Sequence, residues 1–192
     1  MLRAFAPHRS ITFDEYLVVE DTSSTRHEFV GGSLHALAGA SDRHNHIALN
    51  IATRLHDAAD AGPCRVYMSE MKVSIFDETV YYPDVMVTCD PSDTNPYVKS
   101  KPCLVVEVLS PSTATTDLRE KLMEYRRLLD LKAYLVVVQD EMRVIRHWRD
   151  AEGAWWQVEH SGEDRVPLPC PEGFSIALSD IYRNVDMRDI QT

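Results

Sequence analysis

The chain has 192 residues, of which 44% are hydrophobic and 26% are charged, and its formal net charge is −10. This length favours a single domain with a hydrophobic core and is short for two domains. The acidic balance argues against general polyanion binding, since nonspecific nucleic-acid affinity comes from Lys and Arg, but it leaves room for a local basic surface or a bound cation.

The sequence also indicates where the protein resides. No apolar run approaches the ~20 residues of a membrane span, so we expect no membrane association. Residues 1–10 lack the apolar segment of a secretory signal. The cysteines are widely scattered, with no C-x-x-C pair to suggest zinc, and they are Cys64, Cys89, Cys103 and Cys170. We therefore expect reduced thiols in a cytoplasmic protein.

The first 60 residues predict two helices and a hairpin. Residues 11–20 read as a short amphipathic helix, and residues 26–38 as two strands around Gly31-Gly32. A second helix is expected from about Ser41 to Ala59, because apolar residues recur on one face at helical spacing. That face also carries His44.

The middle of the chain predicts strands and one helix. We expect a long strand over 64–76, a turn at 77–79, a strand over 80–89, a loop over 90–102 and a buried strand, CLVVEVL, over 103–109. A capping segment, residues 110–117, precedes a helix over 117–129. One apolar stripe of this helix contains Leu118, Leu122, Tyr125 and Leu129.

A second apolar strand, over 133–140, follows that helix and should lie parallel to the strand before it. Residues 143–150 and 155–160 resemble added antiparallel strands, and a short helix is expected near 178–182. The prediction is an α/β fold, a mixed sheet flanked by helices with the core order α-β-β-β-α-β. In the single domain of residues 1–192, this core spans about 41–140, with additions at 11–40 and 141–192.

An aspartate after a proline interrupts the strand-forming run VYYPDVMVTCD, residues 80–90. Pro83 lacks a ladder N–H and suits the entrance of a strand, where Asp84 would lie at the rim. Alternatively, Asp84 belongs to a functional site.

Glu107 supports the second interpretation, because it lies inside an apolar strand, on the face of Cys103, Val105 and Leu109. A buried carboxylate must be protonated, paired or bound to a cation. If Glu107 and Asp84 lie on adjacent strands, two carboxylates ~4 Å apart would repel each other by about 4 kcal/mol. A divalent cation between them would make the electrostatic interaction favourable. Carboxylate oxygens suit Mg²⁺ or Mn²⁺.

Lys121 borders the apolar stripe of the helix over 117–129, so its stem could reach back over the end of the preceding strand. Beside a metal, this amine could orient water and stabilise a phosphorane-like transition state. The alternative is an ordinary solvated lysine.

The motifs YYPDVMV and LVVEVLSPST, followed by a helix with Glu120-Lys121 and a tyrosine four residues on, resemble the Uma-two (Uma2) family of endonucleases. That family belongs to the restriction-endonuclease-like PD-(D/E)XK superfamily. Upstream, RHEFVGGSLHALAGAS, RHNHIALN and CRVYMSEMKV are also similar to the family, so the resemblance runs from about Ile11 to Tyr182.

The resemblance implies that Asp84 and Glu107 are metal ligands, with the backbone carbonyl of Val108 as a third. The position two residues after Glu107 is Leu109 instead of the superfamily's lysine, and Lys121 would substitute for it.

Further candidates lie upstream. Glu28 and Glu70 match acidic positions of the family, although both could be solvent-facing strand carboxylates. His44 could be a core histidine or a member of the site.

The expected function is a Mg²⁺- or Mn²⁺-dependent endonuclease acting on nucleic acid, with DNA as the favoured substrate and a homodimer as an option for cutting both strands. The rivals are a catalytically silent nucleic-acid-binding module and an assembly domain on the same fold.

Overall fold

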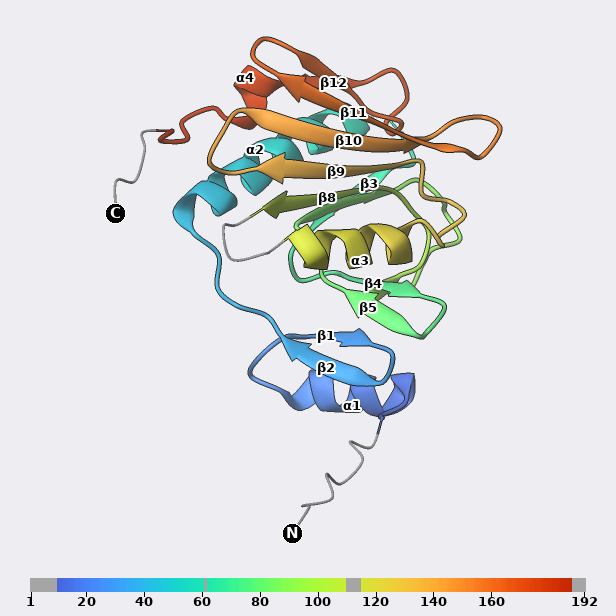
Figure 1. Ribbon diagram of the computed structural model, residues 1–192. Helices are drawn as coiled ribbons and strands as arrows, with labels where there is room; N and C mark the ends of the chain where they lie inside the picture. Colours follow the sequence, from blue (N-terminus) through green and yellow to red (C-terminus); the bar gives the residue numbers. More distant parts are fainter. Residues whose placement is uncertain (1–9, 61, 110–114, 188–192) are drawn as a thin grey trace.

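Two main β-sheets and four helices make up the described part of the chain in a computed structural model, which covers residues 10–60, 62–109 and 115–187 (Figure 1). The larger sheet has the order β11-β10-β9-β8-β6-β3 and the smaller has β2-β1-β5-β4-β7, while β12 and β13 form a separate pair. The strands are β1 His27–Val30, β2 Ser33–Ala36, β3 Arg65–Met68, β4 Lys72–Ile75, β5 Thr79–Tyr81, β6 Val85–Thr88, β7 Val98–Lys99, β8 Pro102–Leu109, β9 Ala133–Val138, β10 Arg143–Arg149, β11 Trp155–Ser161, β12 Arg165–Pro167 and β13 Ser175–Ala177.

The helices begin at side chains that satisfy their first N–H groups. At α1, the Thr12 side chain accepts from the Glu15 N–H and the Glu15 carboxylate accepts from the Thr12 N–H, and at α2 the Ser41 side chain accepts from the His44 N–H. Of the predicted capping segment, residues 110–114 lie outside the described residues. None of the described helices is long and apolar enough to cross a membrane. The helices are α1 Phe13–Thr22, α2 Asp42–Ala59, α3 Thr115–Tyr125 and α4 Leu178–Ile181.

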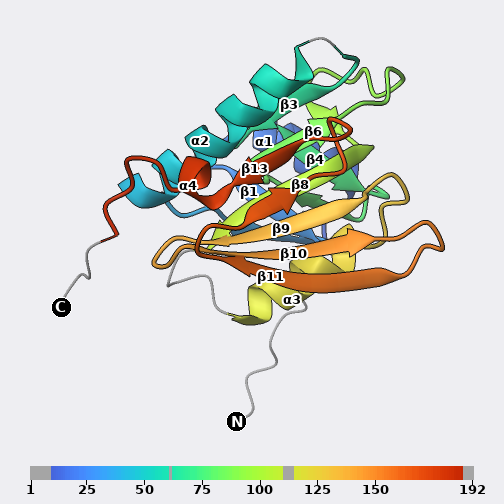
Figure 2. The same cartoon turned by 90° about the horizontal axis from the view of Figure 1, so that it is seen from above.

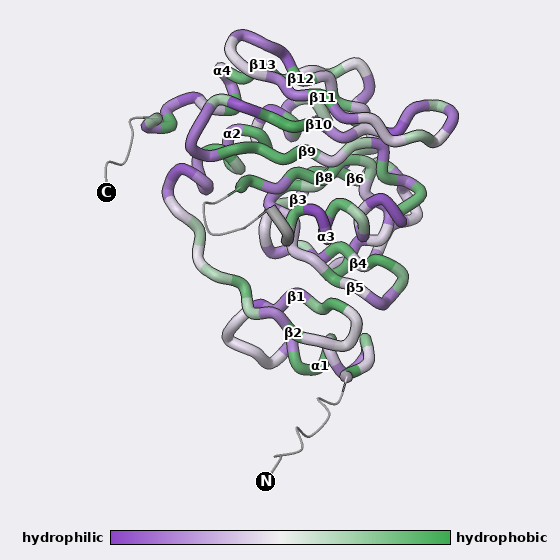
Figure 3. The backbone as a smooth tube through the Cα atoms, in the orientation of Figure 1, coloured by the Kyte–Doolittle hydropathy of each residue, from purple (hydrophilic) through white to green (hydrophobic). Residues whose placement is uncertain are grey.

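The larger sheet is covered on both faces. Helices α2 and α4 pack on the face where Leu104, Val106 and Leu135 are buried, and α3 packs on the opposite face over Val105 and Val136. Figure 2 shows α2 and α3 on opposite sides of this sheet, and Figure 3 shows that β8 and β9 are predominantly hydrophobic. The parallel pairing of β8 with β9 is confirmed, as is the mixed sheet flanked by helices.

The N-terminal hairpin is confirmed, with β1 and β2 paired antiparallel around Gly31 and Gly32. Both glycines have positive φ, 53° and 88°, a backbone conformation that favours glycine. A Cβ atom on Gly32 would also lie 2.6 Å from the Cβ of Ser10. The turn therefore needs glycine for both backbone conformation and space.

The two long strands predicted over 64–76 and 80–89 are each broken in two, which corrects the prediction. Strands β3 and β6 pair in the larger sheet, whereas β4 and β5 pair in the smaller one. The chain thus changes sheets at residues 69–71 and again at 82–84, where strands turn a corner between packed sheets. Pro83 lies between two strands, where its missing N–H leaves no gap in a ladder.

Two predicted side-chain positions are also wrong. Leu129 is 82% exposed, because α3 ends at Tyr125 and does not carry the apolar stripe further. Cys103 packs with the α2-side core and not on the face of Glu107. The pairing of β8 with β6 is irregular here: Val87 pairs with Leu104, but the next residue, Thr88, pairs with Pro102. Cys103 is therefore an extra, bulged residue, and the alternation of side chains between the two faces of β8 reverses at this point.

The expectation of reduced thiols is contradicted by the structure. Disulfides join Cys64 to Cys89 and Cys103 to Cys170, across 25 and 67 residues of sequence. Sequence spacing could not reveal these pairs, because each joins segments that meet only through the sheet.

A buried histidine on β10 makes the fold sensitive to acid. His147 is 7% exposed, stacks on Tyr134 with ring centroids 5.9 Å apart, and has no hydrogen-bond partner for Nδ1 within the described ranges. Burial and the charge of Arg126 lower the pKa of His147 to about 4. The unfolded chain therefore binds this proton more tightly than the folded one, so stability falls as the pH drops from about 6.5 to 4.

We predict that His147→Phe, which keeps an aromatic ring but cannot titrate, loses less thermal stability than the wild type between pH 6.5 and pH 4. Melting temperatures at several pH values measure this difference, since other acid-sensitive groups contribute to both proteins. Parallel curves for the two proteins would show that His147 has no part in acid sensitivity.

Candidate active site

Asp84 lies at the corner between β5 and β6 and is tied to the end of β8. Its Oδ2 atom accepts a 2.7 Å hydrogen bond from the Val108 N–H. The N–H and C=O of one strand residue point toward the same neighbouring strand, so the Val108 carbonyl is directed toward this corner too. The corner therefore brings a carboxylate and a backbone carbonyl together.

Glu107 projects from β8 toward α3 and is 8% exposed. Its Oε1 atom accepts a 2.9 Å hydrogen bond from the Tyr125 hydroxyl and lies 3.6 Å from the Lys121 Nζ. Burial raises the pKa of Glu107 well above its usual range; Lys121 opposes this effect, and the charges of Asp84 and Glu28 add to it. Glu107 and Asp84 thus share one electrostatic environment.

Lys121 is buried and held between carboxylates, so the solvated alternative is wrong. Its Nζ atom lies 2.7 Å from Glu28 Oε1 and 5.1 Å from the centre of the Tyr81 ring. Glu28, on β1 of the smaller sheet, is 8% exposed and does not face solvent. This ion pair links α3 to the N-terminal hairpin and holds the amine beside Glu107.

His44 lies in the first turn of α2 and reaches Asp84, with 3.1 Å between its Nε2 atom and Asp84 Oδ2. Burial alone would lower the pKa of His44, but the Asp84 carboxylate, the charge of Glu107 and a hydrogen bond to the Val108 backbone raise it above its ordinary value. His44 therefore contacts both groups of the corner.

Glu70 has a different environment. Its side chain is 73% exposed and forms a 3.0 Å ion pair with Arg26. It lies at the bend between β3 and β4, on the margin of the same cleft as the other candidates.

A cleft of about 510 Å³ brings all the candidate residues together. The C-terminal end of β8 and the N-terminal end of α2 lie on the same side of the molecule (Figure 1). The candidates that line the cleft are Glu28, Glu70, His44, Asp84, Glu107, Val108 and Lys121.

The chemistry of these donors fits a hard divalent cation. Glu28 and Glu107 share Lys121, and Asp84 adds a third carboxylate that acts on Glu107, so their negative charge exceeds that of the one lysine when all three are ionised. Burial makes this charge costly, and carboxylate and carbonyl oxygens are the ligands that Mg²⁺ and Mn²⁺ prefer. The residues present therefore suit the metal that the sequence suggested.

Tyr125 has a role in the site that was not predicted, although it lies in the apolar stripe and is the tyrosine four residues after Lys121. Burial raises the pKa of Tyr125 well above its usual range, so the hydroxyl stays protonated and donates to Glu107. The available signal was helical spacing, since a residue four positions after Lys121 lies on the same face as the lysine.

This mixed sheet flanked by helices is the fold of a restriction-endonuclease-like protein. The family model described as "Uma2: Putative restriction endonuclease" matches residues 13–179, and the chain belongs to this family.

Two relatives and one solved structure extend the comparison. The uncharacterized protein slr1290 of Synechocystis is 34% identical over 182 residues, covering 94% of this chain and 95% of its own. The uncharacterized protein sll1609 of the same organism is 31% identical over 163 residues, covering 83% and 92%. The crystal structure of a "putative nuclease belonging to DUF820" from Anabaena variabilis superposes with a TM-score of 0.75 at 15% identity, covering 90% of this chain and 97% of that one. This last likeness concerns the fold.

We predict that Lys121→Met lowers the free energy of unfolding by about 3–5 kcal/mol, because it leaves buried carboxylates without their cation. The double variant Lys121→Met/Glu28→Gln should recover a large part of this loss, since it removes the unpaired charge. Urea denaturation of both single variants, the double variant and the wild type measures the coupling. Additive effects of the two substitutions would contradict a coupled pair.

Proposed function

We propose that this protein is a metal-dependent endonuclease that hydrolyses phosphodiester bonds of nucleic acid, with DNA as the substrate. The observation that carries the proposal is the meeting of Asp84, Glu107 and Lys121 in one cleft, although they come from a sheet corner, a buried strand and a helix. The family description and the restriction-endonuclease-like fold support the same chemistry.

The residues that would hold Mg²⁺ or Mn²⁺ are Asp84 and Glu107, with the backbone carbonyl of Val108. When bound, such an ion supplies a Lewis acid for the scissile phosphate and lowers the pKa of a coordinated water. The hydrogen bond from the Val108 N–H fixes the orientation of the Asp84 carboxylate, and the Tyr125 hydroxyl fixes that of Glu107. Both carboxylates are thus oriented before substrate arrives.

Lys121 provides a positively charged side chain in the proposed active site. Its ammonium group would stabilise the negative charge that develops on the phosphate oxygens and would orient the attacking water. Glu28 acts as a positioning residue, because its carboxylate holds the ammonium within 2.7 Å. The product would carry a 5′-phosphate, as the resemblance to the superfamily suggests.

His44 is proposed as a second positioning residue, because it contacts the same Asp84 oxygen that accepts from the Val108 N–H. In its protonated form it would also add positive charge where a phosphate approaches an acidic cleft. Glu70 is solvent-exposed and paired with Arg26, so we assign it no role in the reaction.

The proposed function also has consequences for oligomeric state and location. A homodimer would place two clefts on the two strands of a duplex, as a twofold axis allows. A cytoplasmic location would give the protein access to DNA.

We predict that the wild type nicks supercoiled plasmid DNA with Mg²⁺ or Mn²⁺ and not with a chelator. Asp84→Asn, Glu107→Gln and Lys121→Met should each reduce the rate by about 100-fold or more, because each removes a charge that contacts the reacting phosphate or its metal. Glu78→Gln is the matched control, since Glu78 is an exposed carboxylate paired with Arg127. Cleavage by Glu107→Gln at the wild-type rate would remove Glu107 from the mechanism, and DNA binding by a wild type that never cleaves would indicate the catalytically silent module.

A thermal titration tests the metal site without a substrate. Mn²⁺ should raise the melting temperature of the wild type progressively, because a ligand that binds only the folded state stabilises it by RT ln(1 + [L]/Kd). The increase should disappear in the double variant Asp84→Asn/Glu107→Gln and persist in Glu78→Gln. An unchanged melting temperature of the wild type would favour an assembly domain.

A further inference from the structure

All four cysteines converge at one place, far from the cleft. Cys64 precedes β3 and Cys89 follows β6, and the pairing of Arg65 with Thr88 puts these two cysteines opposite each other. Their Cα atoms are 3.9 Å apart. Cys103 is on β8, and Cys170 lies between β12 and β13. Four segments of the chain therefore contribute one sulfur each.

The two disulfides also contact each other. The Sγ atoms of Cys89 and Cys103, which belong to different disulfides, are 3.5 Å apart, and those of Cys89, Cys103 and Cys170 all lie within 4.8 Å of one another. In a tetrahedral zinc site with Zn–S bonds of about 2.3 Å, neighbouring sulfurs are about 3.8 Å apart. Three of the four sulfurs thus lie close enough together to bind one ion, and Cys64, joined to Cys89, supplies a fourth sulfur beside them.

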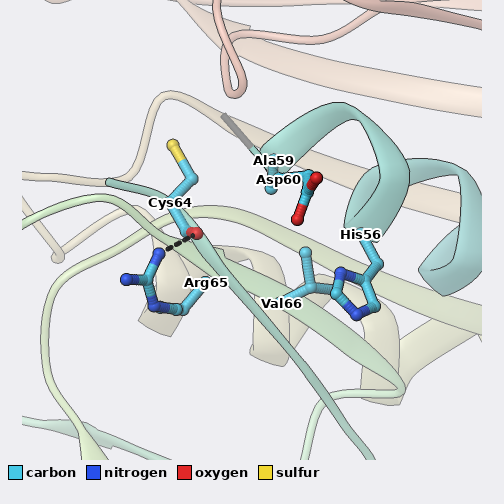
Figure 4. Close-up of a pocket in the computed structure, with 6 residues that line it drawn as sticks. All are labelled: His56, Ala59, Asp60, Cys64, Arg65 and Val66. Carbon is cyan, nitrogen blue, oxygen red and sulfur yellow. Dashed lines mark hydrogen bonds between the residues drawn. The ribbon is translucent and has the colours of Figure 1, made fainter. Parts of the chain in front are cut away.

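The surroundings of the cluster suit a buried structural metal. Cys64, Cys103 and Cys170 are 8%, 7% and 4% exposed and belong to the α2-side core. Thiolates buried in this way require a cation, and a donor set made only of sulfur selects zinc over Mg²⁺. The adjacent pocket is shown in Figure 4, where Arg65 donates to the Cys64 carbonyl while the Cys64 sulfur points away from this guanidinium group.

The cluster is separate from the candidate active site. Cys103 and Glu107 are four residues apart on β8, which corresponds to about 13 Å along the strand. They also face opposite sides of the larger sheet, toward α2 and α3 respectively. Neither the carboxylates nor Lys121 of the cleft contribute to the sulfur cluster.

We propose that in the reduced protein Cys64, Cys89, Cys103 and Cys170 bind one zinc ion as four thiolates. The four thiols release four protons as the ion binds, and the ion fixes the β12–β13 pair to the ends of β3, β6 and β8. The two disulfides are the oxidised form of the same four sulfurs, reached from the thiols by loss of four electrons and four protons to a disulfide oxidant. A dithiol reductant reverses this step.

The test uses the full chain, reduced with a phosphine, supplied with zinc and dialysed against a weak chelator. We expect about one zinc ion per chain by elemental analysis, and replacement by Co²⁺ should give the thiolate-to-cobalt charge-transfer absorption of a tetrahedral sulfur site. A folded, reduced wild type with titratable thiols and no retained zinc would overturn the proposal. This measurement on the wild type decides the matter even if cysteine variants fail to fold.

Two sets of variants locate the ion. Cys103→Ser and Cys170→Ser should lose the zinc under the same dialysis, whereas Asp84→Asn/Glu107→Gln should retain it because its four sulfurs are intact. Loss of zinc from this carboxylate variant, with retention by both serine variants, would place the ion in the cleft and overturn the proposal. The outcome is independent of plasmid cleavage, so the zinc site and the endonuclease are tested separately.

Discussion

The hydrogen bond from the Val108 N–H to Asp84 is the contact on which the candidate site depends. It joins the corner where the chain changes sheets to the end of β8, a strand buried on both faces, and the donor and acceptor atoms are 2.7 Å apart. Strand β8 is packed on both faces and cannot shift without disturbing two cores. Asp84 is thereby held against a rigid element although it lies outside any strand, as preorganised catalysis requires.

The same strand, β8, carries a buried carboxylate whose charge must be compensated by its neighbours. Glu107 is buried, and Asp84 and Glu28 add negative charge nearby. Lys121, the Tyr125 hydroxyl and His44 offset part of this charge, each from a different turn of a helix. A divalent cation bound beside these carboxylates would offset the remainder.

Much of the fold could be predicted because it follows from local patterns. The apolar runs of β8 and β9 required a sheet covered on both faces, and Gly31-Gly32 required a turn. The breaks at residues 69–71 and 82–84 could not be predicted, since each half-strand keeps strand-forming residues and the change of sheet depends on which partners are available. The bulge that turns Cys103 toward α2 was hidden for the same reason, because register is a property of a pair of strands.

The sequence by itself determined the main helices, the buried strands β8 and β9 and the acidic residue that interrupts β8, because periodicity and the cost of burying charge are properties of a single segment. Only the tertiary structure decided that Glu28 pairs with Lys121, that His44 reaches Asp84 and that four scattered cysteines meet. These contacts join residues separated by up to 93 positions along the chain, and their geometry is set by how the two sheets and their helices pack.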